Sequence, residues 1–267
     1  MDAGLSLFED INYDVLGHLF KIPFIDLSLE ISYDFVMQRD IGEILERLKS
    51  SAGGRALRLS MHGPIQGTDI SCAVKSVRLG SLEKFKRCFE LAERLRCKYA
   101  VVHTNSYGAV APEEKMERME AALASIEGIA VEAQNTGVEA VVENVGFLSC
   151  QSLLFNEAEY KRIFSTIKGV YALLDTGHAF INGWNIPKLM LELDGAMRAM
   201  HIHDNDGHED LHQRINREKP VWKDIFSAYF RMCKKPRLIA EYLSLPEISS
   251  GQLLEDFNFM TYHGKFV

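Results

Sequence analysis

Residues 198–212 have the sequence RAMHIHDNDGHEDLH, in which a short apolar run ends in a dense group of histidine and carboxylate side chains. Side chains two apart on a strand share a face, so we expect His201 and His203 to point the same way. Asp210 and His212 repeat this spacing on a predicted loop, where a carboxylate and an imidazole can reach one divalent cation. Taken alone, the stretch also fits a solvated polar loop.

Short apolar runs alternate with longer segments of helical period along the whole chain. This alternation is typical of parallel strands joined by crossover helices. Eight such runs favour a closed barrel over an open sheet. We therefore expect an α/β fold, a (β/α)8 TIM barrel forming one domain over residues 1–267, with strands at residues 4–8, 24–29, 57–61, 99–103, 138–143, 171–175, 198–203 and 237–241.

Helical spacing of apolar residues predicts the connecting segments. Pro112, followed by two glutamates, predicts the start of the longest helix. Trp222 is expected just before the last helix, with its ring on the barrel wall. The first strand has the weakest signal, because both it and the helix after it are short. The predicted helices cover residues 13–20, 40–49, 81–95, 112–133, 187–193 and 225–232.

Composition and charge are those of an ordinary globular enzyme. Hydrophobic residues make up 47% of the 267 residues, and no Pro/Gly/Ser-rich spacer divides them. The net charge of −7 weighs against a nucleic-acid partner without excluding one. The five cysteines show no metal-type pair and are expected to be reduced thiols. With no leader-like start and no long apolar run, we expect a cytoplasmic protein that does not enter the membrane.

Potential metal ligands follow one predicted strand after another. In a parallel barrel all strands deliver their carboxyl ends to the same face, so these side chains should converge. Buried carboxylates are costly when unpaired, and a cation among them is the simplest explanation. Nitrogen and oxygen donors without thiolates favour Zn, Mn, Co or Fe over Mg or Ca. The candidate ligands are His62, His103, Glu143, Asp175, His178, His201, Asp210, His212 and Glu241.

The ordered set of these segments resembles the xylose-isomerase-like TIM-barrel superfamily. That superfamily groups sugar and sugar-phosphate isomerases and epimerases with the apurinic endonucleases of the endonuclease IV type. The segments that carry the resemblance are SMHGP at 60–64, YAVVHTN at 99–105, AVVENVG at 140–146, LLDTGHAF at 173–180, HIHDNDGHEDLH at 201–212 and LIAEY at 238–242.

The resemblance implies two different metal sites. In the isomerase and epimerase branch one divalent ion is held at the positions of Glu143, Asp175, His201 and Glu241, and the two glutamates act as acid and base. In the endonuclease branch a trinuclear zinc site uses the positions of all nine candidate ligands. One to three ions are therefore expected, with a small sugar or sugar phosphate as the partner.

One loop departs from the family pattern. Trp222 keeps its register, but Asn216, Arg217 and Glu218 stand where many members have a Gly-x-Gly loop. Glycines let the backbone approach a ligand closely, so this loop is not expected to contact substrate in that way. Arg214 and Arg217 are instead predicted to bind an anionic group, with plain surface arginines as the alternative. His203 is predicted to shape the substrate site beside His201.

Two reaction types fit these residues. The first is a metal-dependent isomerase or epimerase that works through an enediolate, with Glu143 and Glu241 as acid and base. The second is a trinuclear-zinc phosphodiester hydrolase. A metal-dependent dehydratase would use the same enolate chemistry, and a non-catalytic binding protein is a further alternative. The sequence leaves the substrate, the number of ions and a homo-oligomeric state open.

Overall fold

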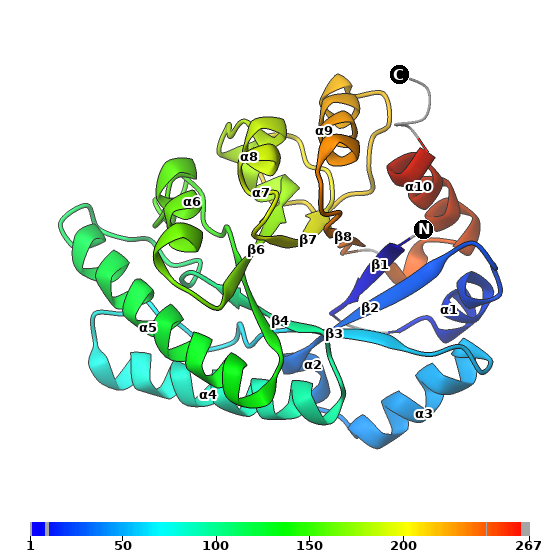
Figure 1. Ribbon diagram of the computed structural model, residues 1–267, viewed down its shortest axis with the longest axis horizontal. Helices are drawn as coiled ribbons and strands as arrows, with labels where there is room; N and C mark the ends of the chain where they lie inside the picture. Colours follow the sequence, from blue (N-terminus) through cyan, green and yellow to red (C-terminus); the bar gives the residue numbers. More distant parts are fainter. Residues whose placement is uncertain (1, 9–10, 244, 263–267) are drawn as a thin grey trace.

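Eight parallel strands form a closed barrel at the centre of the computed structural model, which describes residues 2–8, 11–243 and 245–262. Each strand pairs with the next in the sequence, and β8 pairs with β1 to close the ring (Figure 1). The predicted (β/α)8 fold is therefore confirmed. The strands are β1 (Asp2–Leu7), β2 (Asp26–Ser32), β3 (Arg58–His62), β4 (Tyr99–His103), β5 (Glu139–Glu143), β6 (Val170–Asp175), β7 (Met197–Ile202) and β8 (Arg237–Ala240).

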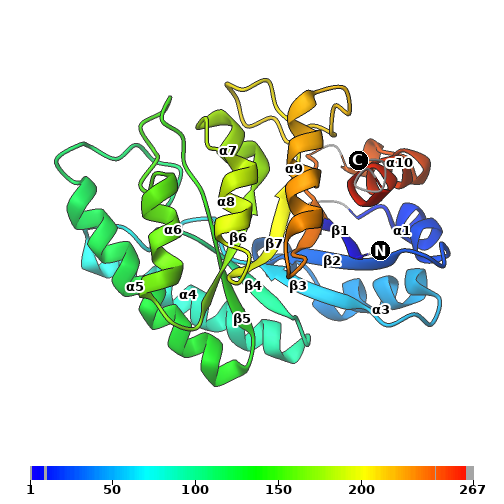
Figure 2. The same cartoon turned by 45° about the horizontal axis from the view of Figure 1, so that its top comes forward.

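Helices connect the strands and surround the barrel (Figures 1 and 2). Among the described residues, none of these helices has the length and apolarity needed to span a membrane. They are α1 (Tyr13–Phe20), α2 (Tyr33–Val36), α3 (Ile41–Ala52), α4 (Lys75–Arg94), α5 (Lys115–Thr136), α6 (Glu157–Thr166), α7 (Thr176–Ile181), α8 (Ile186–Glu192), α9 (Pro220–Arg231) and α10 (Ser250–Tyr262), with a 3₁₀ turn at Leu245–Glu247.

Several boundaries differ from the sequence prediction. Strand β2 continues to Ser32, three residues beyond its predicted end at Leu29. The helix predicted to start at Pro112 begins only at Lys115, because the preceding residues form a turn closed by the bond from the Glu114 N–H to the Ala111 carbonyl. Helices α2, α6, α7 and α10 were not predicted at all.

Trp222 lies inside α9 and not before it, since Pro220 occupies the first turn of that helix. Proline suits this position because its missing N–H would have no partner there. The Trp222 ring is buried and stacks on Phe226, while its Nε1–H donates to Asp204 at 3.2 Å. The tryptophan therefore joins α9 to the loop that follows β7.

The barrel interior continues directly into the ligand-bearing mouth. Alternate residues on β4 to β7 form a small apolar cluster inside the ring, namely Tyr99, Val101, Val141, Leu173 and Ala199. Side chains two apart on a strand share a face, so the next inward position on these four strands is occupied by a polar residue. Those residues are His103, Glu143, Asp175 and His201, all at most 9% exposed.

We expect Gly63→Ala to destabilise the fold, because a Cβ there would lie 2.2 Å from the Val101 carbonyl oxygen, which belongs to the backbone and cannot turn away. Overpacking of this kind costs roughly 1–3 kcal/mol. Gly128→Ala is the matched control: no heavy atom lies within 4 Å of its added Cβ, inside α5. It should stabilise the protein by roughly 0.5–1 kcal/mol. Urea unfolding measures both, and equal midpoints would contradict the expectation.

Candidate active site

Three groups of metal-type ligands lie at the carboxyl ends of the strands, with the ligand atoms in each group within 4.8 Å of one another. The structure brings together all nine residues predicted as ligands, and it adds His203 to them. The first group is Glu143, Asp175, His201 and Glu241; the second is His62, His103 and Glu143; the third is His178, His203, Asp210 and His212.

The first group is centred on the Nδ1 atom of His201. This nitrogen lies 3.0 Å from Glu241 Oε2, 3.5 Å from Glu143 Oε1 and 3.7 Å from Asp175 Oδ2. All four residues are at most 3% exposed. Three carboxylates and one imidazole therefore face one another out of contact with bulk water.

The second group shares Glu143 with the first. Glu143 Oε2 lies 3.1 Å from His103 Nε2 and 3.7 Å from His62 Nε2, and these two nitrogens are 3.3 Å apart. The other carboxylate oxygen, Oε1, faces His201. Glu143 thus presents one oxygen to each of two neighbouring groups.

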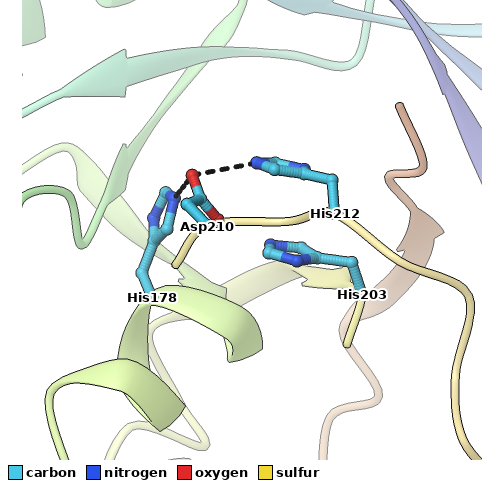
Figure 3. Close-up of side chains that lie close together, drawn as sticks. All are labelled: His178, His203, Asp210 and His212. Carbon is cyan, nitrogen blue, oxygen red and sulfur yellow. Dashed lines mark hydrogen bonds and ion pairs between the residues drawn. The ribbon is translucent and has the colours of Figure 1, made fainter. Parts of the chain in front are cut away.

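The third group comes from α7 and the loop after β7 (Figure 3). Asp210 Oδ2 lies between His178 Nε2 at 3.2 Å and His212 Nε2 at 3.1 Å. The ring of His203 stacks on that of His212 with centroids 3.9 Å apart and an angle of 8° between the planes. His203 Nε2 also lies 3.0 Å from each carboxylate oxygen of Asp175. His203 therefore connects the first group to the third.

Local hydrogen bonds fix where these ligands point. Asp175 is both the last residue of β6 and the N-cap of α7, where its Oδ1 accepts from the His178 N–H at 2.7 Å. Asn144, next to Glu143, exchanges two hydrogen bonds with the Asp175 backbone, at 2.8 and 3.1 Å. The spacing between the ends of β5 and β6 is therefore set by side chains as well as by the strand pairing.

Backbone carbonyls orient three of the histidines. The Nδ1 atoms of His62, His178 and His212 lie 3.2, 2.9 and 3.2 Å from carbonyl oxygens. A carbonyl only accepts, so each Nδ1–H donates and Nε2 is the nitrogen that faces the ligand group. Metal-binding histidines are oriented in this way.

Burial and neighbouring charges shift the pKa values of these groups. Burial alone would lower the pKa of His178, but the carboxylates of Asp175 and Asp210 overcome it and raise that pKa to about 10. For the same reasons, with Asp210 as the main partner, the pKa of His212 rises to about 9. Burial would raise the pKa of Asp175, yet His178 and His203 bring it down to about 2. Asp175 is therefore ionised and attracts positive charge.

The residues present fit a divalent cation. Glu143 Oε2 and His201 Nδ1 are buried and make no well-aligned hydrogen bond among the described residues, although each faces charged ligand atoms, the nearest at 3.1 and 3.0 Å. Buried polar atoms without a partner are rare, and a bound ion is one of their explanations. The donors are imidazole nitrogens and carboxylate oxygens, which suit Zn or another first-row metal.

The two arginines predicted to bind substrate lie away from these groups. Arg214 donates to both carboxylate oxygens of Asp256 in α10, at 2.9 and 3.0 Å, and Asp256 is fully buried. Arg217 pairs with Glu255 of the same helix at 2.8 Å. In the structure both guanidinium groups therefore attach the loop after β7 to α10.

Asp204 holds the loop that contains Asn216, Arg217 and Glu218. Its carboxylate accepts from the Asn216 N–H at 2.9 Å, the Lys219 ammonium at 2.6 Å and Trp222 Nε1 at 3.2 Å. These bonds fix the loop without any close approach of a glycine to a ligand. Figure 2 shows this connection between β7 and α9 in yellow.

Sequence reasoning missed two kinds of residue at the site. Glu30, on β2, is fully buried and lies 2.8 Å from His201 Nε2. Its signal was the alternation of polar and apolar residues in DLSLEIS at 26–32, where Glu30 stands between Leu29 and Ile31. The apolar lining of the mouth was also missed. A pocket opens onto the ligands, and its other lining residues are Phe8, Ile65, Tyr107, Tyr242 and Leu243.

A parallel eight-stranded barrel with its ligand groups at the carboxyl ends of the strands defines the class of (β/α)8 proteins whose site lies at that face. Residues 25–259 match the family described as xylose isomerase-like TIM barrel, and the chain belongs to that family. An uncharacterized protein of Methanocaldococcus jannaschii is 26% identical over 163 residues, which cover 61% of this chain. The match spans 62% of that relative, less than two thirds of its length.

Solved structures share the whole fold. A D-tagatose 3-epimerase-like protein has a TM-score of 0.78 at 17% identity, with 100% of this chain and 98% of that chain covered. D-psicose 3-epimerase from Clostridium cellulolyticum, solved with D-tagatose, has a TM-score of 0.76 at 16% identity and coverages of 100% and 99%. A Thermus thermophilus protein soaked with zinc chloride has a TM-score of 0.73 at 19% identity and coverages of 97% and 98%. At these identities the likeness concerns the fold.

We expect zinc binding to release protons and to strengthen as the pH rises. Without a cation, His201 in the first group and His178 and His212 in the third keep their second protons at neutral pH, because neighbouring carboxylates raise the pKa of His201 well above its usual range and those of His178 and His212 to about 10 and about 9. Each must lose its proton before the nitrogen can bind a metal, so acid competes with zinc. Calorimetric titration in two buffers of different ionisation enthalpy measures the protons released. Identical heats in the two buffers would contradict this expectation.

Proposed function

We propose that the protein is a metal-dependent isomerase or epimerase that acts on a small sugar. The observation that carries the proposal is the placement of Glu143 and Glu241 in the first ligand group. They come from β5 and from the end of β8, well apart around the ring, and both contact His201 Nδ1, at 3.5 and 3.0 Å. Both also line the pocket. Two carboxylates can therefore reach one bound substrate from different sides.

The proposed chemistry is a proton transfer at a carbon next to a carbonyl group. A divalent cation held by Glu143, Asp175, His201 and Glu241 would supply the positive charge that stabilises an enediolate. One glutamate removes the proton from the substrate carbon, and the other returns a proton to it. Return to the opposite face of the same carbon gives epimerisation, while return to the neighbouring carbon gives isomerisation.

The lining of the pocket supports a sugar as the substrate. The aromatic and aliphatic side chains of Phe8, Tyr107 and Leu243 surround the polar groups and can cover the apolar faces of a sugar ring or chain. None of the described residues that line this pocket is Lys or Arg, which favours a neutral sugar over a sugar phosphate. The fold shared with D-psicose 3-epimerase and a D-tagatose 3-epimerase-like protein also supports the proposal.

The second candidate function is metal-dependent phosphodiester hydrolysis. It is favoured by the second and third ligand groups, which a one-ion isomerase does not need. The two functions make different demands on Glu143. If cations occupied the first and second groups together, both carboxylate oxygens of Glu143 would be ligands, and it could not take a proton from a substrate. A free Oε2 is therefore required for the isomerase and not for the hydrolase.

We expect Glu143→Gln to abolish the exchange of a substrate proton with solvent deuterium while metal remains bound. The amide keeps an oxygen donor but cannot accept a proton as a carboxylate does, so the rate should fall by roughly 10²–10⁴-fold. Mass spectrometry of ketoses incubated in D₂O and metal analysis of the same sample measure this. Glu139→Gln, at the other end of β5, is the matched control and should exchange normally. If Glu143→Gln exchanges the substrate proton with solvent deuterium as fast as the wild type does, Glu143 is not the catalytic acid or base.

Metal content and DNA cleavage separate the two functions. Under the isomerase proposal, zinc-loaded protein retains one ion per chain and does not nick a duplex that contains an abasic site. Three retained ions together with robust nicking would transfer the assignment to the hydrolase. His103→Ala is then informative, because its nitrogen belongs to the second group only, and its loss should lower the ion count and stop cleavage.

A further inference from the structure

Glu30 is a buried carboxylate that belongs to none of the three ligand groups. It lies on β2, on the far side of the barrel interior from β7, and it is fully buried. Its Oε1 lies 2.8 Å from His201 Nε2 and accepts a second, longer bond from the Ser6 hydroxyl at 3.4 Å. Because a buried carboxylate is costly unless it is paired, its contact with His201 needs an explanation.

The contact determines which nitrogen of His201 is left for the ligand group. A carboxylate accepts, so the Nε2–H of His201 donates to Glu30 and Nδ1 is the nitrogen left to face Glu143, Asp175 and Glu241. His62, His178 and His212 have the reverse arrangement, with Nδ1 donating to a backbone carbonyl. Among the described ligand histidines, His201 and His203 both contact a carboxylate of another strand, and only for His201 does that carboxylate lie outside all three ligand groups.

We propose that Glu30 is a positioning residue for the metal site of the first group: it holds the imidazole of His201 with Nδ1 toward the cation and, through its negative charge, makes that nitrogen a stronger donor. The inference rests on the proposed metal-binding role of that group. Glu30 does not touch the cation itself, because the ring of His201 lies between its carboxylate and the group. Outer carboxylates of this kind strengthen metal binding by histidine.

The experiment compares zinc affinity in Glu30→Gln and Ser60→Ala, measured by competition with a chromophoric chelator. The amide in Glu30→Gln keeps the shape but loses the charge, and we expect zinc affinity to fall roughly 10- to 100-fold. Ser60 pairs in register with Glu30 on the neighbouring strand and is equally buried, but it does not contact His201 among the described bonds. Ser60→Ala should therefore bind zinc as the wild type does.

Two readouts distinguish positioning from a general structural effect. In the zinc-loaded wild type, the His201 Nε2 proton should give a far-downfield, slowly exchanging NMR signal, and Glu30→Gln should move that signal upfield or remove it. In a double-mutant cycle, Glu30→Gln should change zinc affinity no further once His201→Ala is present, because the two act through one contact. Additive losses of affinity would overturn the proposal.

The possible outcomes separate this inference from the proposed function. If the wild type binds no zinc, the proposed metal site itself fails. If the wild type binds zinc and Glu30→Gln binds it equally well with the NMR signal unchanged, the metal site stands and the role of Glu30 is refuted. If Glu30→Gln does not fold, Glu30→Asp replaces it. That variant keeps the charge but draws the carboxylate back from His201, so its zinc affinity should fall between the control and His201→Ala, and unchanged affinity would refute the role.

Discussion

The buried negative charge at the mouth of the barrel is the constraint on which the rest of the site depends. Four carboxylates here are at most 3% exposed, so bulk water hardly solvates their charges: Glu30, Glu143, Asp175 and Glu241. Imidazoles are the partners that the chain provides. They lower the pKa of the Glu143 carboxyl well below its usual range, although burial alone would raise it. A divalent cation would stabilise the same carboxylates more strongly than a protonated imidazole does, because it carries twice the charge on a smaller ion.

Barrel geometry turns this local requirement into a ring of ligands. The two-residue period of each strand places Val101, Val141 and Leu173 inside the ring and places the next inward side chains, which are polar, at its mouth. Asp175, the last residue of β6, has two roles: it caps the N-terminus of α7, and its carboxylate faces His201. The fold and the site are therefore stabilised by some of the same bonds, and a change at Asp175 would affect both.

The sequence predicted the strands and the polar side chains that meet at their carboxyl ends, because each of these side chains directly follows its own apolar run. It failed where the partner is distant. Glu30 lies in DLSLEIS, where alternation normally places the polar side chains toward solvent, and only closure of the barrel turns that face inward. Arg214 looked free to bind an anion because Asp256, its partner 42 residues later, has no local signal. Pairings across the barrel depend on the three-dimensional fold, and spacing along one segment does not reveal them.

The same ring of ligands is compatible with two chemistries, and one atom separates them. Glu143 Oε1 faces the first group, whereas Oε2 faces His62 and His103. The proposed isomerase requires an unliganded Oε2, through which Glu143 would exchange a proton with a substrate in the pocket that it lines. The alternative hydrolase would instead use Oε2 to hold a second cation; Glu143 would then be unable to transfer a proton, and several cations together would stabilise a phosphoryl group. The number of cations held at the mouth would therefore decide between the two proposed reactions.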